Sequence, residues 1–176
     1  MTSLGDLLPP FLAERTRPCR QGVDFSPTGE FVLYWMRSAV RVDENPALDA
    51  ALVLAERLKV GVLVYHALSE RYPFASDRHH TFVLQGARDV QAALAQRSIP
   101  YAFHLERRGH RGPHLRTLGE RAAVVVTEEM PVDPLRRWTD LLARQLARPV
   151  LCVDTACVVP MRTVGKAYTR AYAYRD

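Results

Sequence analysis

The first side chains that could do chemistry follow a continuous apolar run, FVLYW, near residue 31. Arg37 and Arg41 come directly after it, and guanidinium groups are well suited to binding phosphate or carboxylate. The glycine patterns G-x-G-x-x-G and G-x-x-x-x-G-K-[ST] are missing here, so these side chains, not bare backbone amides, would have to hold a phosphate. Pairing with the nearby Asp43 or Glu44 is an equally good interpretation.

A second polar group follows a later apolar run, VVVT. Glu128 and Glu129 come at its end and could bind the hydroxyls or ring nitrogens of a ligand. Capping of the helix that follows explains them equally well. His66 follows a third apolar run in the same manner.

The histidines do not form a metal-binding pattern. His79 and His80 are adjacent and would point to different faces of a helix. His104, His110 and His114 lie around a strand end and a loop, without the outer partners that orient metal ligands. We therefore predict no metal site, and the absence of G-x-S-x-G argues against a hydrolase.

The cysteines and the N-terminus indicate the compartment. The sequence has three cysteines, Cys19, Cys152 and Cys157, and no clear signal peptide. The pattern predicts free thiols in a reducing cytoplasm, and the apolar runs are too short to span a membrane. The net charge of +5 permits a nucleic acid partner without requiring one.

The elements that must position these residues alternate between strand and helix, which is typical of a doubly wound α/β domain with a five-stranded parallel sheet. Asn45-Pro46, Ser76 or Asp77, and Asp133-Pro134 are typical helix starts. Strands are expected at 31–36, 60–66, 101–105, 122–127 and 149–153, and helices at 46–59, 78–97, 113–120 and 133–147.

Three regions follow from this pattern. Residues 1–30 are expected to form an N-terminal arm that ends in a turn at Pro27-Thr28-Gly29, and residues 31–157 the α/β domain. Residues 67–77 should be a loop containing Pro73. Residues 158–176 are polar and aromatic, without a clear burial pattern.

Several segments together resemble the DNA photolyases, and among them the class II cyclobutane pyrimidine dimer photolyases. The order and spacing of the segments carry the resemblance, which covers nearly the whole chain. The segments are PPFLAERTR (9–17), YWMRSAVRVDENPAL (34–48), DRHHTFVLQGARDV (77–90), VVVTEEMPVDPLRRW (124–138) and VDTACVVPMRTVGKAYTRAYAYR (153–175).

The resemblance implies a Rossmann-like N-terminal domain of a two-domain flavoprotein. In this family a helical domain holds FAD and the damaged DNA, and light absorbed by the reduced flavin drives electron transfer that splits the pyrimidine dimer. That domain would follow in cis beyond Asp176, with 158–176 as the start of the linker. The chain would then contain no catalytic residue, be inactive in repair when isolated, and be a cytoplasmic monomer with no membrane contact.

The resemblance also implies an antenna pigment, a deazaflavin or methenyltetrahydrofolate, in the α/β domain. The expected place is above the carboxyl ends of the first and fourth strands, where the strand order reverses. Ser38 and Ala39 replace the acid that many relatives carry there, which puts antenna binding in question. The candidate pigment-binding residues are Trp35, Met36, Arg37, Ser38, His66, Glu128 and Glu129.

Two other functions are compatible with the same elements. A stand-alone nucleotide- or pigment-binding module would share the layout of the universal stress proteins, although the missing glycine-rich loop counts against it. A cryptochrome-like photoreceptor has the same N-terminal domain as a photolyase, so these segments do not separate the two.

Overall fold

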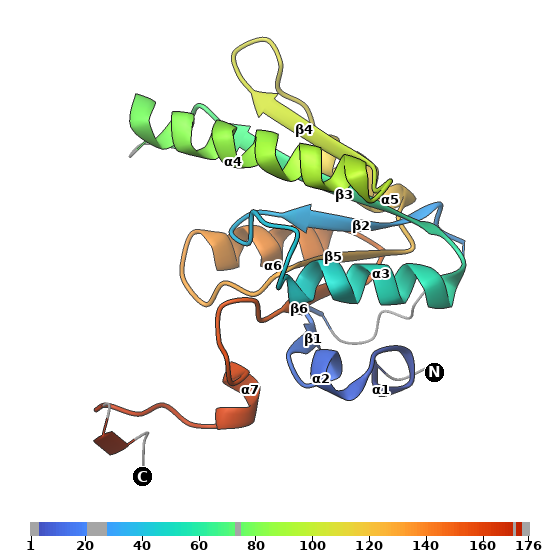
Figure 1. The fold of residues 1–176 in the computed structure, drawn as a ribbon, viewed down its shortest axis with the longest axis vertical. Coiled ribbons are helices and arrows are strands. Elements are labelled where there is room, and N and C mark those ends of the chain that lie inside the picture. The colour runs from blue at the N-terminus through green and yellow to red at the C-terminus, as the bar shows by residue number, and fades with distance from the viewer. Residues whose placement is uncertain (1–3, 21–27, 73–74, 171, 174–176) are drawn as a thin grey trace.

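A single sheet flanked by helices organises the chain in the computed structural model, which describes residues 4–20, 28–72, 75–170 and 172–173 (Figure 1). The sheet has six strands in the order β1-β6-β5-β2-β3-β4. The strands are β1 (Thr16–Pro18), β2 (Phe31–Met36), β3 (Gly61–Ser69), β4 (Tyr101–Glu106), β5 (Val124–Glu128) and β6 (Val150–Val153).

The helices cover both faces of the sheet. On one face α3 and α4 pack with α1 and α2, and Leu54 and Leu94 are fully buried there. On the other face α5 and α6 enclose a second core around Leu33 and Leu146. The helices are α1 (Leu4–Leu7), α2 (Pro10–Ala13), α3 (Pro46–Leu58), α4 (Asp77–Gln96), α5 (His114–Arg121), α6 (Leu135–Gln145) and α7 (Met161–Val164).

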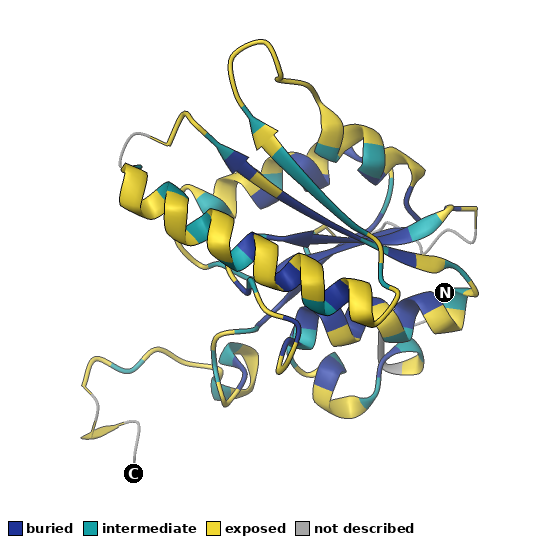
Figure 2. Cartoon of the chain, turned by 45° about the horizontal axis from the view of Figure 1, so that its top comes forward, coloured by how far each residue is buried: buried dark blue, intermediate teal, exposed yellow. Residues whose placement is uncertain are grey.

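The predicted α/β class and its five parallel strands are confirmed. Four parallel pairings join β2 to β3, β3 to β4, β2 to β5, and β5 to β6. The buried strands are continuous apolar runs because helices cover both of their faces (Figure 2). The α4 helix exposes one side to solvent along its length, and that side is mostly polar but includes Phe82 and Leu84 (Figure 2).

The N-terminal arm contributes a sixth strand that the sequence did not predict. Within it, β1 pairs antiparallel with β6, and Arg17 lies opposite Cys152. Three residues ending in proline show no strand periodicity, so only the long-range pairing identifies this edge strand. Of the predicted turn before β2, Pro27 lies outside the described residues.

The prediction of free thiols is wrong for two of the three cysteines. Cys19 and Cys152 form a disulfide with their Cα atoms 6.1 Å apart, and Cys157 is free. The reason is the β1–β6 pairing, in which the Cys19 amide donates to Val150 O at 2.8 Å. That contact brings together two residues that are 133 positions apart in the sequence.

Two of the three predicted helix starts are confirmed. The Asn45 side chain accepts from the amides of Ala47 and Leu48, and Ser76 accepts from His79. The prediction that Asp133 caps α6 is wrong, because the N-cap is Pro134 and Asp133 pairs with arginines of the first turn instead.

The connections differ in smaller ways. Strand β3 runs on to Ser69, so it takes up part of the predicted 67–77 loop, whose Pro73 lies outside the described residues. A short helix, α7, lies in the 158–176 segment. Among the helices in the described part of the chain, none combines the length and apolar character that a membrane crossing requires.

Candidate functional site at the switch point of the sheet

The candidate site lies where the strand order reverses. From β2 the chain proceeds through β3 to β4 on one side of the sheet, whereas β5 and β6 lie on the other. Strands β2 and β5 are therefore neighbours, with Trp35 opposite Thr127. In open α/β sheets the carboxyl end of this strand pair is the usual place for a ligand.

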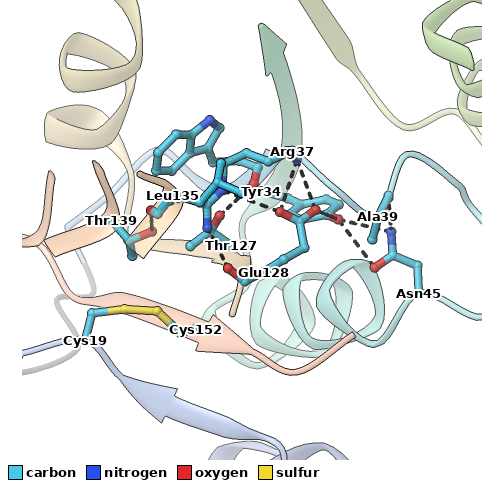
Figure 3. A network of polar contacts seen from close by, with 11 residues as sticks. Cys19, Tyr34, Arg37, Ala39, Asn45, Thr127, Glu128, Leu135, Thr139 and Cys152 are labelled. Atoms are coloured by element: carbon cyan, nitrogen blue, oxygen red, sulfur yellow. Dashed lines mark hydrogen bonds and ion pairs between the residues drawn. A yellow bond between two sulfur atoms is a disulfide. The ribbon is translucent and has the colours of Figure 1, made fainter. Parts of the chain in front are cut away.

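A fully buried carboxylate, Glu128, lies at this point (Figure 3). The Tyr34 hydroxyl donates to its Oε1 at 2.6 Å, and the Arg37 backbone amide donates to both of its oxygens at 3.1 Å. The Arg37 Nε atom lies 3.7 Å from Oε2. The end of β5 is thus bound to the end of β2 by a buried ion pair with hydrogen bonds on both carboxylate oxygens.

The Arg37 guanidinium is largely engaged with the protein, although its Nε atom makes no hydrogen bond within the described part of the chain. It donates to the backbone oxygens of Leu135 at 3.1 Å and Glu128 at 2.5 Å, and it stacks over Trp35 at 4.3 Å from the ring centroid. Its side chain is only 7% exposed. These contacts leave little of the cation for an external anion.

Burial shapes the titration of this cluster. It lowers the pKa of Arg37, and the neighbouring Glu128 carboxylate opposes that shift. Burial also raises the pKa of Tyr34 well above its ordinary value, and the adjacent Glu128 charge adds to the effect. Tyr34 therefore stays protonated and serves as a permanent donor to the carboxylate.

Asn45 connects this cluster to the start of α3. Its Nδ2 atom lies 3.0 Å from the Tyr34 hydroxyl and donates to the backbone oxygens of Ala39 at 3.1 Å and Arg41 at 2.8 Å. The helix cap and the turn after β2 are thus held by one buried side chain (Figure 3).

The remaining predicted site residues are dispersed. His66 is buried, its Nδ1 lies 2.9 Å from the Tyr101 hydroxyl, and burial lowers its pKa to about 4. Glu129 forms an ion pair with Arg17 of the arm at 2.7 Å. Met36 is fully buried, whereas Ser38 is exposed.

The structure therefore brings together Trp35, Arg37 and Glu128, but not all seven candidates. The alternative partners considered for the arginines are wrong for Arg37, which pairs with Glu128. Arg41 does bond Glu44, but through the backbone oxygen, and it also donates to the backbone of Thr155. Glu128 likewise does not cap the following helix.

Sequence reasoning missed Tyr34. A tyrosine inside an otherwise aliphatic and aromatic run gives no signal of its own, because its hydroxyl partner is 94 residues away. Thr127 was also missed, and its Oγ1 donates to Trp35 O at 2.9 Å.

The arrangement does not fit a pigment lying directly on these side chains. Most donors and acceptors of Arg37 and Glu128, and Nδ1 of His66, are already engaged with protein partners. A hollow of about 380 Å³ lies beside the cluster, between the loop after β2 and the loop after β6. Its lining includes Arg15, Arg41, Glu44, Asp49 and Thr155.

Among the described residues, no three His, Cys, Asp or Glu side chains are grouped to hold a metal ion.

Fold and site together define a doubly wound, Rossmann-like α/β domain with a closed switch point. Solved structures share this fold at low sequence identity. A universal stress protein from Pseudomonas aeruginosa is 11% identical with a TM-score of 0.53, covering 81% of this chain and 53% of that one. A protein of unknown function from the same species is 11% identical with a TM-score of 0.50, covering 75% and 50%. These likenesses establish the fold alone.

Sequence comparison identifies the family. Residues 32–175 match the family model described as DNA photolyase. The chain is also 33% identical over 153 residues to a deoxyribodipyrimidine photo-lyase from Methanothermobacter thermautotrophicus. The chain belongs to the DNA photolyase family. The match covers 87% of this chain and 34% of that relative, so the chain spans about a third of the relative's length.

Proposed function

We propose that this chain is the α/β domain of a class II photolyase that repairs cyclobutane pyrimidine dimers in DNA. The supporting observation is the match of residues 32–175 to the family, together with 33% identity to a protein named as a deoxyribodipyrimidine photo-lyase. FAD, held in a helical domain outside this sequence, would supply the light-driven electron transfer. That domain would also hold the damaged DNA, and the whole protein would act as a cytoplasmic monomer.

Within such a protein this domain acts as a scaffold. The buried Arg37–Glu128 pair fixes the ends of β2 and β5 to each other, and Arg37 also ties them to the first residue of α6. A rigid carboxyl edge of the sheet would then hold the surfaces that meet the second domain in one geometry. The residues of this chain would hold those surfaces in position, and the light-driven chemistry would occur in the helical domain.

For an antenna pigment we propose an indirect role of the predicted residues. The floor of the switch point is formed by Trp35, Arg37 and Glu128. The open space beside this floor is the hollow lined by Arg41 and Thr155. A deazaflavin or methenyltetrahydrofolate would meet Ser38 and the rim of that hollow, not the buried ion pair.

The decisive experiment uses the complete gene product. It should bind FAD, and after photoreduction it should restore an oligonucleotide with a single thymine dimer only under blue light. Flavin binding and a light response without repair would favour the cryptochrome-like alternative. Tight FAD binding by residues 1–176 alone would contradict the assignment of the flavin to another domain.

Antenna binding is tested separately by titrating residues 1–176 with a deazaflavin and with methenyltetrahydrofolate and following absorbance and fluorescence. A Thr155→Tyr substitution, which fills the hollow, should weaken binding. An Arg57→Gln substitution on the exposed surface of α3 is the matched control. Equal binding by both variants would contradict the assignment to this hollow.

A further inference from the structure

A second hollow lies far from the switch point, at the edge of the sheet. The loop between β4 and α5 projects from the body of the domain there (Figure 1). The hollow has a volume of about 580 Å³, and it opens widely to solvent. It is lined by His104, Leu105, Arg107, Gly109, His110, Arg111 and His114.

The backbone of this loop is held in a defined turn. The His110 amide donates to Arg107 O at 2.9 Å, and these two residues form an isolated antiparallel bridge. Gly109 between them has a φ of 79°, in the left-handed region that glycine adopts at little cost. The turn therefore holds the backbone at Arg107 and His110 in a fixed relation.

His104 fixes this turn to the sheet. Its Nε2 atom lies 3.2 Å from His110 O, and its Nδ1 lies 3.1 Å from the Tyr65 hydroxyl. Because a carbonyl oxygen only accepts, Nε2 is the donor in its contact with His110. The His114 ring packs edge-on against His104 at 4.4 Å between centroids, so this imidazole is also positioned.

The lining is cationic. Arg111 is partly neutralised by Glu70 at 2.6 Å and by Glu106 at 3.8 Å. Arg107 is exposed, and among the described residues it has no ion pair. The described residues that line the hollow include two arginines and three histidines but no acid. Positive charge and N–H donors thus line an open space, and Arg107 in particular has no acid to balance it among the described residues.

We propose that this hollow binds phosphate groups, with Arg107 and Arg111 as the charged donors and His110 and His114 as further N–H donors. Arginine forks match phosphate oxygens, and imidazoles add donors at the rim. The lining contains no Phe, Tyr or Trp on which a base could stack, so the phosphate itself is the recognised group. The site goes beyond the proposed repair function and does not depend on it.

Phosphate of this kind could come from a DNA backbone or from a free polyphosphate, and the test separates the two. Residues 1–176 are titrated with pyrophosphate by calorimetry and with a fluorescent 20-nucleotide DNA strand by anisotropy, at low and moderate salt. Binding of both ligands indicates the DNA backbone as the source, and binding of pyrophosphate alone indicates a free polyphosphate. Either result supports a phosphate site, and binding of neither overturns it.

The variants locate the binding. Arg107→Gln and His110→Ala remove side chains that make no contact needed for the turn, because His110 holds the turn through its backbone. Arg107→Gln should weaken pyrophosphate binding about tenfold, as expected for the loss of one charge-assisted hydrogen bond, and His110→Ala should weaken it less.

Arg57→Gln, with the same change in net charge on α3, should leave the affinity unchanged. Equal weakening by Arg57→Gln and Arg107→Gln would show attraction by net charge only and would overturn the site. Circular dichroism confirms that each variant is folded. No flavin or light enters this test, so its failure is distinguishable from failure of the repair function.

Discussion

The backbone amide of Arg37 donates to both carboxylate oxygens of Glu128, each at 3.1 Å, although the two residues are 91 positions apart. The Arg37 side chain adds an ion pair to the same carboxylate. This double contact closes the place where an open α/β sheet usually accepts a ligand. It turns two residues expected to bind a ligand into part of the framework, and the framework can be tested by mutation.

Glu128→Ala should destabilise the domain severely. It leaves the buried Arg37 charge uncompensated, and the loss of one partner of such a pair typically costs about 3–5 kcal/mol. Urea denaturation followed by circular dichroism measures the difference in the free energy of unfolding between the variant and the parent protein.

Two further substitutions serve as controls. Glu128→Gln, which keeps acceptors for Tyr34 and the Arg37 amide, should cost less. Glu120→Gln, which breaks the exposed pair with Arg116, should cost roughly 0–1 kcal/mol. Similar losses for Glu128→Ala and Glu120→Gln would contradict a structural role for the buried pair.

Asn45→Ala should cost more than the loss of an ordinary helix cap. The substitution removes the acceptor for two α3 amides and a donor to the turn, all in a fully buried place. We expect a loss of about 2–3 kcal/mol, against about 1 kcal/mol for Ser76→Ala at the exposed start of α4. The free energy of unfolding of the two variants, measured side by side, decides this. Equal costs would mean that Asn45 acts as a cap only.

The Cys19–Cys152 disulfide predicts a stability that depends on redox conditions. Thiol titration of the unfolded, unreduced protein should find one reactive group, Cys157, and three after reduction. Cys19→Ser should lower the free energy of unfolding by roughly 2–5 kcal/mol under oxidising conditions, because the bond closes a long loop. Under reducing conditions the variant and the parent protein should differ little. Three reactive thiols before reduction would restore the prediction of free thiols.

His66 predicts a loss of stability on acidification. Burial lowers its pKa to about 4, below the ordinary value near 6.5 that it regains on unfolding. Between these two values the unfolded chain binds more protons than the folded one, so the free energy of unfolding falls as the pH falls from about 6.5 to about 4. Other groups also titrate in this range, so the comparison with His66→Gln isolates the effect. That variant should take up roughly one proton fewer on unfolding near pH 5. An unchanged slope would contradict the assignment.

Much of the fold could be predicted because its signals are local. The apolar run at Phe31–Met36 and the Asn45-Pro46 helix start lie within a few residues of what they determine, and both are confirmed. The adjacency of the first and fourth predicted strands followed from the doubly wound architecture and is also confirmed. β1 could not be predicted, because an edge strand of three residues has no periodicity and depends on β6 for its hydrogen bonds.

The sequence by itself determined the α/β architecture, the position of the switch point and, through its family motifs, the membership among DNA photolyases. Only the tertiary structure decided what the polar residues do there. Whether Arg37 faces a ligand or Glu128, and whether Cys19 is free or bonded to Cys152, depends on contacts across about a hundred residues. Periodicity and capping patterns carry information only about residues that are close in the sequence. A buried charge takes as its partner whichever group the packed fold brings within reach, because leaving it unpaired in the interior costs too much.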